Sequence, residues 1–256
     1  MNNNSAKIEE NEFYQYYIYK AANTFWYFNE LIHSGFEGYT AVKFKNNNGI
    51  YVWLENLKIE DLYYVGELAE TGISQQVLKR EVIDWMIIEE GRLIGGYTIR
   101  NYRDTLDDEA KIDFDNNFGV KIDDGNDFFK PDSTTAEGTI IKIENFYSDK
   151  NLEGILSCKD FMLEAENLLE ERSVTITEEL QLEIAHALKT SFIQGLETDG
   201  FPYFNDIERN FTLLNKKKDK CLIQEKVIYP DGVISYNKLW VGHSNDEEWK
   251  VLNNIE

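Results

Sequence analysis

Apolar residues near the start of the chain follow a helical spacing, which changes to a strand-like spacing after residue 38. Residues 13–32 contain neither glycine nor proline, and their apolar side chains recur every three or four positions. This spacing is typical of one face of a helix. We therefore predict a helix over residues 13–32, with Gly35 as its C-terminal cap.

Short apolar runs separated by turn signals follow, a pattern that is typical of an antiparallel sheet. The sequences "NNNG" (46–49) and "EEG" (89–91) predict tight turns, because asparagine and glycine adopt positive φ at low cost. Residues 74–82 are predicted to form a short helix or a loop. The strands are predicted at 39–45, 50–57, 62–70, 82–91 and 92–103.

A second set of elements is predicted after residue 138. Residues 138–147 are predicted to be a strand, and two amphipathic segments, 157–171 and 175–196, are predicted to be helices. Thr177 is placed to cap the second of these helices. The sequence "PDG" (230–232) predicts a hairpin turn. The remaining strands are predicted at 210–216, 220–229, 233–242 and 247–253.

Acidic residues are dense between these two parts. Residues 107–137 contain ten acidic residues and three lysines, a net charge of −7, which predicts a linker or a loosely structured arm. The predicted fold class is therefore α+β. An N-terminal helix on a curved antiparallel sheet (1–106) precedes the acidic arm (107–137), and two helices with a second antiparallel sheet (138–256) follow.

The charge of the chain limits its partners. With 47 acidic and 26 basic residues, a net charge of −21, the protein repels nucleic acid and anionic membranes and attracts basic proteins. Residues 107–256 carry −16 of this charge. The alternative interpretation is that the acidity serves only to keep the protein in solution.

Several features predict a soluble, cytoplasmic protein. The polar N-terminus lacks the basic and apolar regions of a signal peptide, and no apolar run reaches the roughly 18 residues that a membrane helix needs. The two cysteines, Cys158 and Cys221, form no CxxC motif and suit a reducing compartment.

The most specific motif lies in residues 51–103. Three blocks occur in order: "YVWLENL" (51–57), "YYVGELAE" (63–70) and "VIDWMIIEEGRLIGGYTIRNYR" (82–103). Together they resemble the DUF2314 family of bacterial proteins, whose members end in the pattern DWM…G-x-L-x-GGYT-x-R. The matching residues are Trp53, Leu54, Gly66, Leu68, Asp84, Trp85, Met86, Gly91, Leu93, Gly95, Gly96, Tyr97, Thr98 and Arg100.

The resemblance covers roughly residues 20–106 and implies a small α+β domain without established catalytic residues. Some relatives sit among candidate immunity-type proteins, which implies a protein-binding role. Two loops depart from the family pattern: "AETGIS" replaces the usual Asn-Glu-Pro step, and "VLKRE" replaces a Gly-Asp step. Residues beyond Asp107 are not covered by the resemblance.

The candidate site residues are Asp84, Trp85, Tyr97 and Arg100. In a structural interpretation, the consecutive glycines 95–96 favour a bulge or the close approach of another backbone, and the ring of Trp85 or Tyr97 fills the space that they leave. Asp84 then caps a turn or pairs with Arg100. In a functional interpretation, the four side chains surround a shallow groove, because arginine with aromatic residues is typical of binding surfaces.

Metal and cofactor signals are weak, and no metal site or cofactor is predicted. Glu183 and His186 have the i, i+3 spacing of di-metal bundles, but such a site also needs further carboxylates from other helices. Asp113, Asp115 and Asn117 have calcium-loop spacing, but the sixth position of that loop is not glycine. The alternatives there are a solvated acidic arm, which we favour, and a weak cation site.

Three functions are compatible with the sequence. The first is a non-enzymatic acidic module that binds a basic protein, as an immunity-type protein does. The second is a small-ligand-binding or enzymatic domain with a site near Asp84, Tyr97 and Arg100. The third is a scaffold that binds another copy of itself. We favour the first, because the sequence carries no nucleophile or phosphate-loop motif; the oligomeric state stays open.

Overall fold

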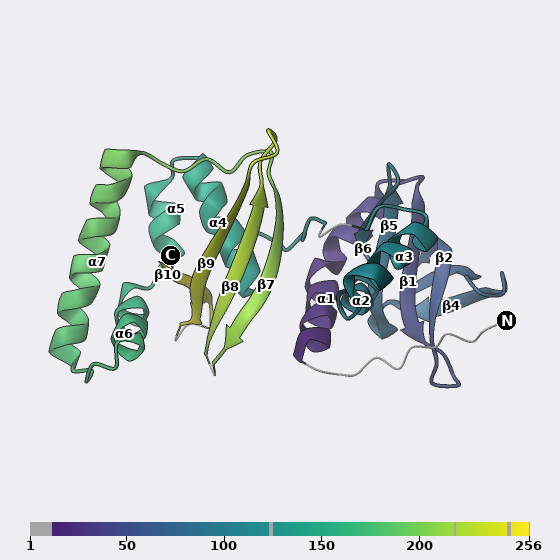
Figure 1. The fold of residues 1–256 in the computed structure, drawn as a ribbon, viewed down its shortest axis with the longest axis horizontal. Coiled ribbons are helices and arrows are strands. Elements are labelled where there is room, and N and C mark those ends of the chain that lie inside the picture. Colours follow the sequence, from purple (N-terminus) through teal and green to yellow (C-terminus); the bar gives the residue numbers. More distant parts are fainter. Residues whose placement is uncertain (1–11, 123–124, 218, 245–246, 256) are drawn as a thin grey trace. The chain divides into compact units, whose positions relative to one another are not determined.

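The computed structural model describes residues 12–122, 125–217, 219–244 and 247–255. The chain divides into two compact units, Met1–Phe128 and Phe129–Glu256, which we call the N-terminal and C-terminal units (Figure 1). The boundary between them lies within the acidic segment 107–137.

The N-terminal unit consists of helix α1 (Glu12–His33) packed on a six-stranded antiparallel sheet (Figure 1). The strand order is β4-β3-β2-β1-β5-β6. This confirms the predicted helix and the predicted antiparallel sheet. The strands are β1 (Tyr39–Lys45), β2 (Tyr51–Glu60), β3 (Tyr63–Leu68), β4 (Ser74–Leu78), β5 (Val82–Glu89) and β6 (Arg92–Gly95).

An aromatic cluster fills the space between α1 and the sheet. Phe28 of α1 is fully buried, and its ring centroid lies 5.4 Å from that of Trp85 and 6.0 Å from that of Tyr64. Tyr27 stacks on Phe128 at 3.6 Å, with the two rings nearly parallel. Large rings bury much apolar area per residue, so the aromatic-rich helix predicted at 13–32 supplies most of one wall of this core.

Two predicted elements in this unit are wrong. Residues 74–78 form strand β4, paired with β3, and only residues 79–81 form a short 3-10 helix. The strand predicted at 92–103 ends at Gly95 and is followed by helix α2 (Tyr97–Asp104). In both places contacts that are distant in sequence decide the structure: Val77 enters the core, and the cap of α2 comes from β5.

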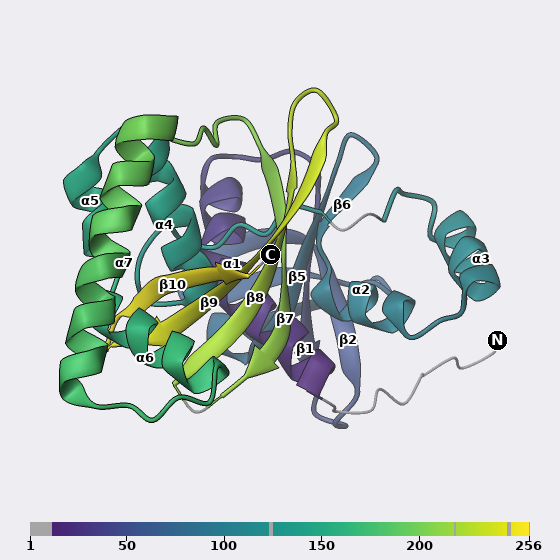
Figure 2. The ribbon, with the colours of Figure 1, turned by 60° about the vertical axis from the view of Figure 1, so that its left-hand side comes forward.

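Part of the predicted acidic arm is a helix, α3 (Asp108–Phe118), which Figure 2 shows at the periphery of this unit. Asp107 caps its start by accepting the Ala110 N–H, and Gly119 ends it with φ 81°. Phe114 and Phe118 pack beside a small cluster on the second face of the sheet, which contains Ala41, Met86, Leu93 and Ile122. The acidic helix is therefore anchored by its apolar side.

The C-terminal unit consists of four helices followed by a four-stranded antiparallel meander of order β10-β9-β8-β7. The α+β class is thereby confirmed, as are both predicted helices. Thr177 accepts the Leu180 N–H as predicted, and Gly232 has φ 84° in the predicted hairpin turn. The elements are α4 (Ala136–Ser148), α5 (Leu152–Ser157), α6 (Phe161–Glu171), α7 (Glu178–Asp199), β7 (Glu208–Lys216), β8 (Lys220–Ile228), β9 (Ile234–His243) and β10 (Trp249–Ile255).

The strand predicted at 138–147 is wrong, because this segment belongs to helix α4. Eight of the 13 residues of α4 are buried, so the segment has no polar face from which a helical period can be read. Thr135 caps the helix by accepting the Gly138 N–H at 3.0 Å. That Thr-x-x-Gly step was the available local signal for a helix start.

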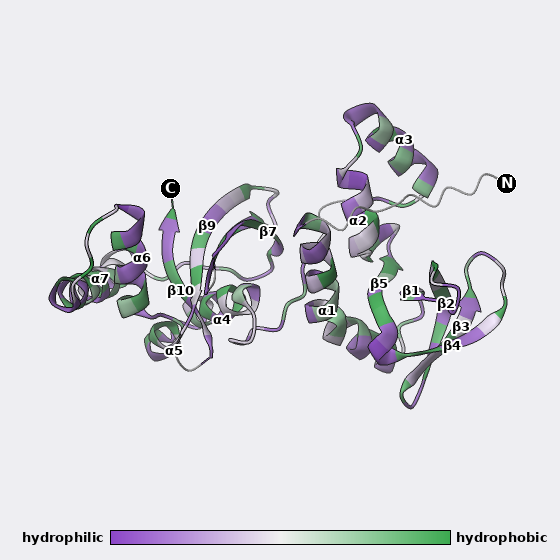
Figure 3. Cartoon of the chain, turned by 90° about the horizontal axis from the view of Figure 1, so that it is seen from below, coloured by the Kyte–Doolittle hydropathy of each residue, from purple (hydrophilic) through white to green (hydrophobic). Residues whose placement is uncertain are grey.

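Hydropathy colouring places apolar residues along β5, within the core of the N-terminal unit (Figure 3). Helices α3 and α7 alternate between polar and apolar residues along their length (Figure 3). Across the described ranges, every helix is too short or too polar to cross a membrane.

Candidate functional site

Asp84 caps helix α2 from the neighbouring strand β5. Its side chain is almost completely buried. The carboxylate accepts the main-chain N–H of Trp85 (2.8 Å), Tyr97 (3.1 Å) and Thr98 (2.7 Å), and also the Thr98 hydroxyl (2.7 Å). The Tyr97 and Thr98 N–H groups belong to the first turn of α2, where N–H groups have no partner within the helix. Of the two predicted structural roles of Asp84, capping is therefore the one observed.

Lys43 of β1 lies next to this carboxylate and was not identified from the sequence. Its ammonium group donates to the Thr98 hydroxyl oxygen at 3.0 Å. Burial lowers the pKa of Lys43, an effect that the charge of Asp84 opposes. Burial also raises the pKa of Asp84, and the Thr98 hydrogen bonds and the Lys43 charge oppose that rise. Lys43 is opposite Asp84 in the strand register, which sequence alone does not fix.

Gly95 lacks a side chain and therefore leaves room for the Trp85 ring in the core. The backbone of Gly95 has φ 72°, and a Cβ atom there would lie 2.5 Å from the Trp85 carbonyl oxygen and 2.7 Å from its ring. The Trp85 indole N–H donates to the Ala21 carbonyl at 3.1 Å and to the Thr24 hydroxyl at 3.2 Å. The predicted approach of an aromatic ring to this glycine is confirmed for Trp85.

Replacing Gly95 with alanine is expected to lower the free energy of unfolding of the N-terminal unit by about 3 kcal/mol. Gly91→Ala is the matched control, because Gly91 also has positive φ but has open space around it; we expect it to cost about 1 kcal/mol. Urea unfolding monitored by hydrogen exchange in peptides of residues 82–104 measures both changes. Equal losses for the two variants would show that Trp85 does not occupy the space beside Gly95.

Arg100 binds the end of strand β6 through main-chain carbonyl groups. Its guanidinium donates to the carbonyl oxygens of Gly95 (2.6 Å) and Leu93 (2.5 Å). A Cβ atom on Gly125 would lie 2.6 Å from the same guanidinium, so the chain also passes close to this side chain at residue 125. Arg100 thereby fixes the junction between β6 and α2 by its planar set of donors.

The structure thus brings the four candidate site residues together and buries all of them. The exposed fractions are 1 % for Asp84, 0 % for Trp85, 2 % for Tyr97 and 6 % for Arg100. The Tyr97 ring packs edge-on against Trp85 at 6.0 Å, and burial raises the pKa of its hydroxyl. These contacts support the structural interpretation of the motif, whereas a binding role for these residues stays a hypothesis.

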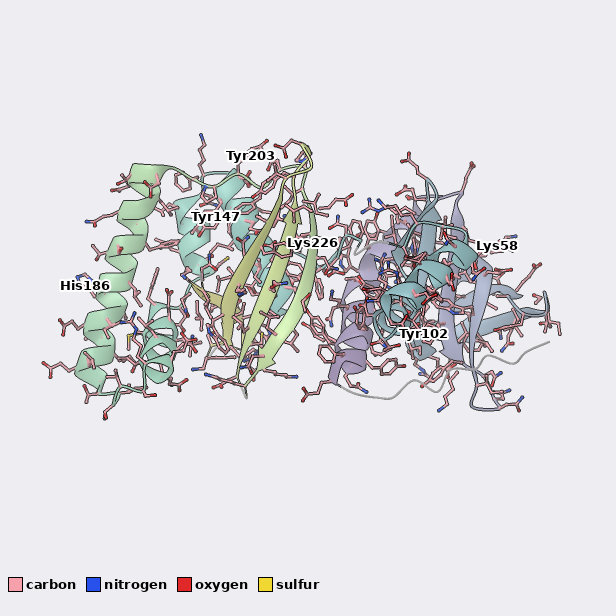
Figure 4. The ribbon with its side chains drawn as sticks, in the orientation of Figure 1. Lys58, Tyr102, Tyr147, His186, Tyr203 and Lys226 are labelled. Atoms are coloured by element: carbon pink, nitrogen blue, oxygen red, sulfur yellow. The ribbon has the colours of Figure 1, made fainter. Side chains whose placement is uncertain are left out.

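Helix α3 carries several exposed carboxylates. Asp108, Glu109 and Asp113 are exposed, and no residue of α3 is buried. Asp115 is held by both arms of the Arg103 guanidinium at 2.7 Å each, an interaction that lowers the pKa of Asp115. Next to Arg103, the labelled Tyr102 ring (Figure 4) contacts Phe114 edge-on at 5.5 Å.

The calcium-loop spacing noted in the sequence falls on this helix. Asp113, Asp115 and Asn117 belong to α3, not to a loop, and the twelfth position, Asp124, lies outside the described residues. Within the part of the chain that the structure describes, no group of three or more His, Cys, Asp or Glu side chains is placed to hold a metal ion.

Acidity is shared evenly between the units. The N-terminal unit contains 23 acidic and 12 basic residues, and the C-terminal unit contains 24 and 14, so their net charges are −11 and −10. The sequence-based division at residue 106 gave most of the charge to the second half. The difference arises because the acidic residues of 107–128 belong to the N-terminal unit.

A buried carboxyl pair lies between α4 and the sheet of the C-terminal unit. Arg209 of β7 is 3.0 Å from a Glu144 oxygen and 3.7 Å from a Glu225 oxygen, and Asn237 donates to Glu225 at 3.3 Å. Burial, followed by the charge of Glu225, raises the pKa of Glu144 well above its usual 4.5. With Glu144 protonated, the charges of Arg209 and Glu225 balance each other.

One family profile matches the chain. The family described as "Uncharacterized protein conserved in bacteria (DUF2314)" covers residues 15–122, which include the Asp84–Arg100 junction and all of α3. The remaining residues are unassigned. No curated protein and no solved structure matches the chain.

Proposed function

We propose that this protein, whose residues 15–122 belong to the DUF2314 family, is a non-enzymatic module that binds a basic protein partner through exposed carboxylates. The α3 helix is the proposed contact. This role corresponds to an immunity-type protein, which neutralises a partner by covering its surface.

The observation that carries this proposal is the accessible charge of α3. Residues 107–118 contain five acidic residues and one lysine, and Asp108, Glu109 and Asp113 point their charge into solvent. Each unit also carries a net negative charge, so the chain as a whole has a negative field. Such a field increases the rate at which a basic partner is captured, and it disfavours acidic competitors.

The two other functions are less well supported. An enzymatic or small-ligand site near Asp84, Tyr97 and Arg100 requires atoms that a substrate can reach, and these side chains are at most 6 % exposed. A scaffold built from copies of this chain must bring together molecules that each carry −21, and like charges oppose that association.

The proposal is tested by capture of the tagged full chain with its partners from the cells that produce it, at about 0.05 M and about 0.5 M salt, because salt screens charges over this range. We expect mass spectrometry to identify a basic protein that is retained at low salt and released at high salt. Retention of only neutral or acidic proteins, or of partners insensitive to salt, would contradict the proposal.

Two triple variants provide the matched comparison. D108N/E109Q/D113N removes three charges from α3, and E178Q/E179Q/E183Q removes three from α7; each set contains two acidic residues of a helix first turn and one exposed acidic residue further along. The α3 variant is expected to lose the partner at low salt, whereas the α7 variant is expected to retain it.

A further inference from the structure

A surface cleft in the C-terminal unit is lined by cations, although the unit as a whole is acidic. The cleft has a volume of about 550 Å³ and is lined by the start of α6, the middle of α7, Ser244 after β9 and Lys250 of β10. Three lysines, Lys159, Lys189 and Lys250, line it together with His186; among the described residues, Asp160 is the one acidic side chain of the lining. A cleft of this size is within the range of small-molecule sites.

Two of the lysines are held in place by the fold. Lys159 has a side chain only 5 % exposed; its ammonium group is 2.7 Å from a Glu164 oxygen and donates to the Leu252 carbonyl. The ammonium group of Lys250 donates to the Ser157 carbonyl at 3.0 Å and to Glu248 at 2.7 Å. These contacts orient both cations before any ligand arrives, which reduces the entropic cost of binding.

The charge that is not neutralised within the cleft comes from α7. Glu164 and Glu248 balance the two held lysines, and the Asp160 carboxylate accepts the N–H groups of Met162 and Leu163 at the start of α6. Lys189 is exposed and has no ion-pair partner among the described residues. His186 projects from the same helix (Figure 4). An anionic group therefore complements Lys189 at this rim.

Apolar side chains lie beside these cations. Met162 is 38 % exposed and Leu182 is 61 % exposed, and both line the cleft. The Lys159 ammonium also lies 5.5 Å and 5.3 Å from the ring centroids of Phe161 and Phe192. A ligand that carried only charge would leave the apolar surface in water, and a purely apolar ligand would desolvate the lysines without compensation.

We propose that this cleft binds a small organic anion, a carboxylate or phosphate ester that carries an apolar group. Lys189 contacts the anionic group at the rim, beside the Lys159 and Lys250 ammonium groups, whose charges Glu164 and Glu248 balance. Met162 and Leu182 hold the apolar group. This site is separate from the α3 surface and does not depend on the proposed protein partner.

The test is a fluorescence titration of the full chain with 8-anilinonaphthalene-1-sulfonate, an organic anion with apolar rings. We expect saturable binding that phenyl phosphate or benzoate displaces and that benzyl alcohol, which is uncharged, does not. Displacement by phenyl phosphate alone or by benzoate alone identifies which of the two anionic groups the cleft prefers.

Two exposed positions allow substitutions that leave the fold intact. Lys189→Gln and Leu182→Gln are each expected to weaken the dye about fivefold, the effect of one solvent-exposed contact. Lys150→Gln is the control, since Lys150 is exposed after α4 and does not line the cleft. Absence of saturable binding, displacement by benzyl alcohol, or equal affinity in wild type and Lys189→Gln would overturn the proposal.

Discussion

Replacing Asp84 with alanine is expected to lower the free energy of unfolding of the N-terminal unit by about 4 kcal/mol. The wild-type carboxylate accepts three main-chain N–H groups and the Thr98 hydroxyl in a site that is 1 % exposed. Alanine leaves these donors buried without acceptors, and each unsatisfied buried group costs about 1–3 kcal/mol. The loss also removes the cap of α2.

Asp84→Asn separates the loss of acceptors from the loss of volume. An amide has one acceptor oxygen and presents an NH₂ group toward N–H donors. We therefore expect Asp84→Asn to lower the free energy of unfolding by more than half as much as Asp84→Ala does. Urea unfolding followed by hydrogen exchange in residues 82–104 measures both, with the exposed Asp113→Ala as control. A loss below about 1 kcal/mol for Asp84→Ala would contradict the capping role.

The second large effect is expected at Arg209 in the C-terminal unit. Arg209→Met leaves Glu144 and Glu225 buried without their cation, and removal of one partner from a buried ion pair costs about 3–5 kcal/mol. Glu225→Gln in the same chain removes the uncompensated charge, so the double variant is expected to regain part of the loss. Urea unfolding followed by hydrogen exchange in peptides of β7 and β8 measures the change. An unchanged stability in Arg209→Met would show that the cluster does not depend on this cation.

The same cluster makes the stability of this unit depend on pH. The pKa of Glu144 is raised in the folded state. The stability that protonated Glu144 contributes to the fold is therefore fully present below about pH 4.5, and it is lost as pH rises through the folded-state pKa. Glu144→Gln lacks this loss. The variant is therefore expected to gain stability relative to wild type as pH rises, in unfolding measured at several pH values. A constant difference would mean that Glu144 does not titrate in this range.

Local patterns predicted much of the fold. The helix at 13–32 and the strands at 39–45 and 220–229 have clear periods and clear turns, so each is found close to its predicted position. Turn chemistry was equally informative: Gly49 and Gly91 have φ 77° and 74° at the predicted tight turns. These signals are local, because the residues that decide the conformation are adjacent in sequence.

Elements determined by distant contacts could not be predicted in the same way. Helix α2 depends on a cap from Asp84, 13 positions before its first residue, and α4 is buried on most of its surface. A distant contact also explains why residue 66 is glycine, because a Cβ atom there would lie 2.3 Å from the Glu55 carbonyl oxygen of strand β2. The residue type at such positions can be read from the sequence, but the contact that requires it can be identified only in the folded structure.

At the candidate site, too, some features could be predicted from the sequence and others depend on distant contacts. The four residues that the motif singled out, Asp84, Trp85, Tyr97 and Arg100, lie at one strand–helix junction. The burial of Asp84 and Arg100 could not be predicted from the sequence. Charged residues are rarely buried without partners, and the main partners of these two side chains are main-chain groups. Lys43 was missed because its strand pairs with β5 only in the folded sheet.

The association rate of the captured partner is the most direct test of binding through α3. Stopped-flow mixing of the purified partner with the wild-type chain and with the two triple variants is performed from about 0.05 M to about 0.5 M salt. We expect a rate that falls about tenfold or more across this range for wild type and for E178Q/E179Q/E183Q. For D108N/E109Q/D113N we expect a clearly weaker salt dependence. Equal salt dependence in all three proteins, or none in any, would contradict binding through the acidic surface of α3.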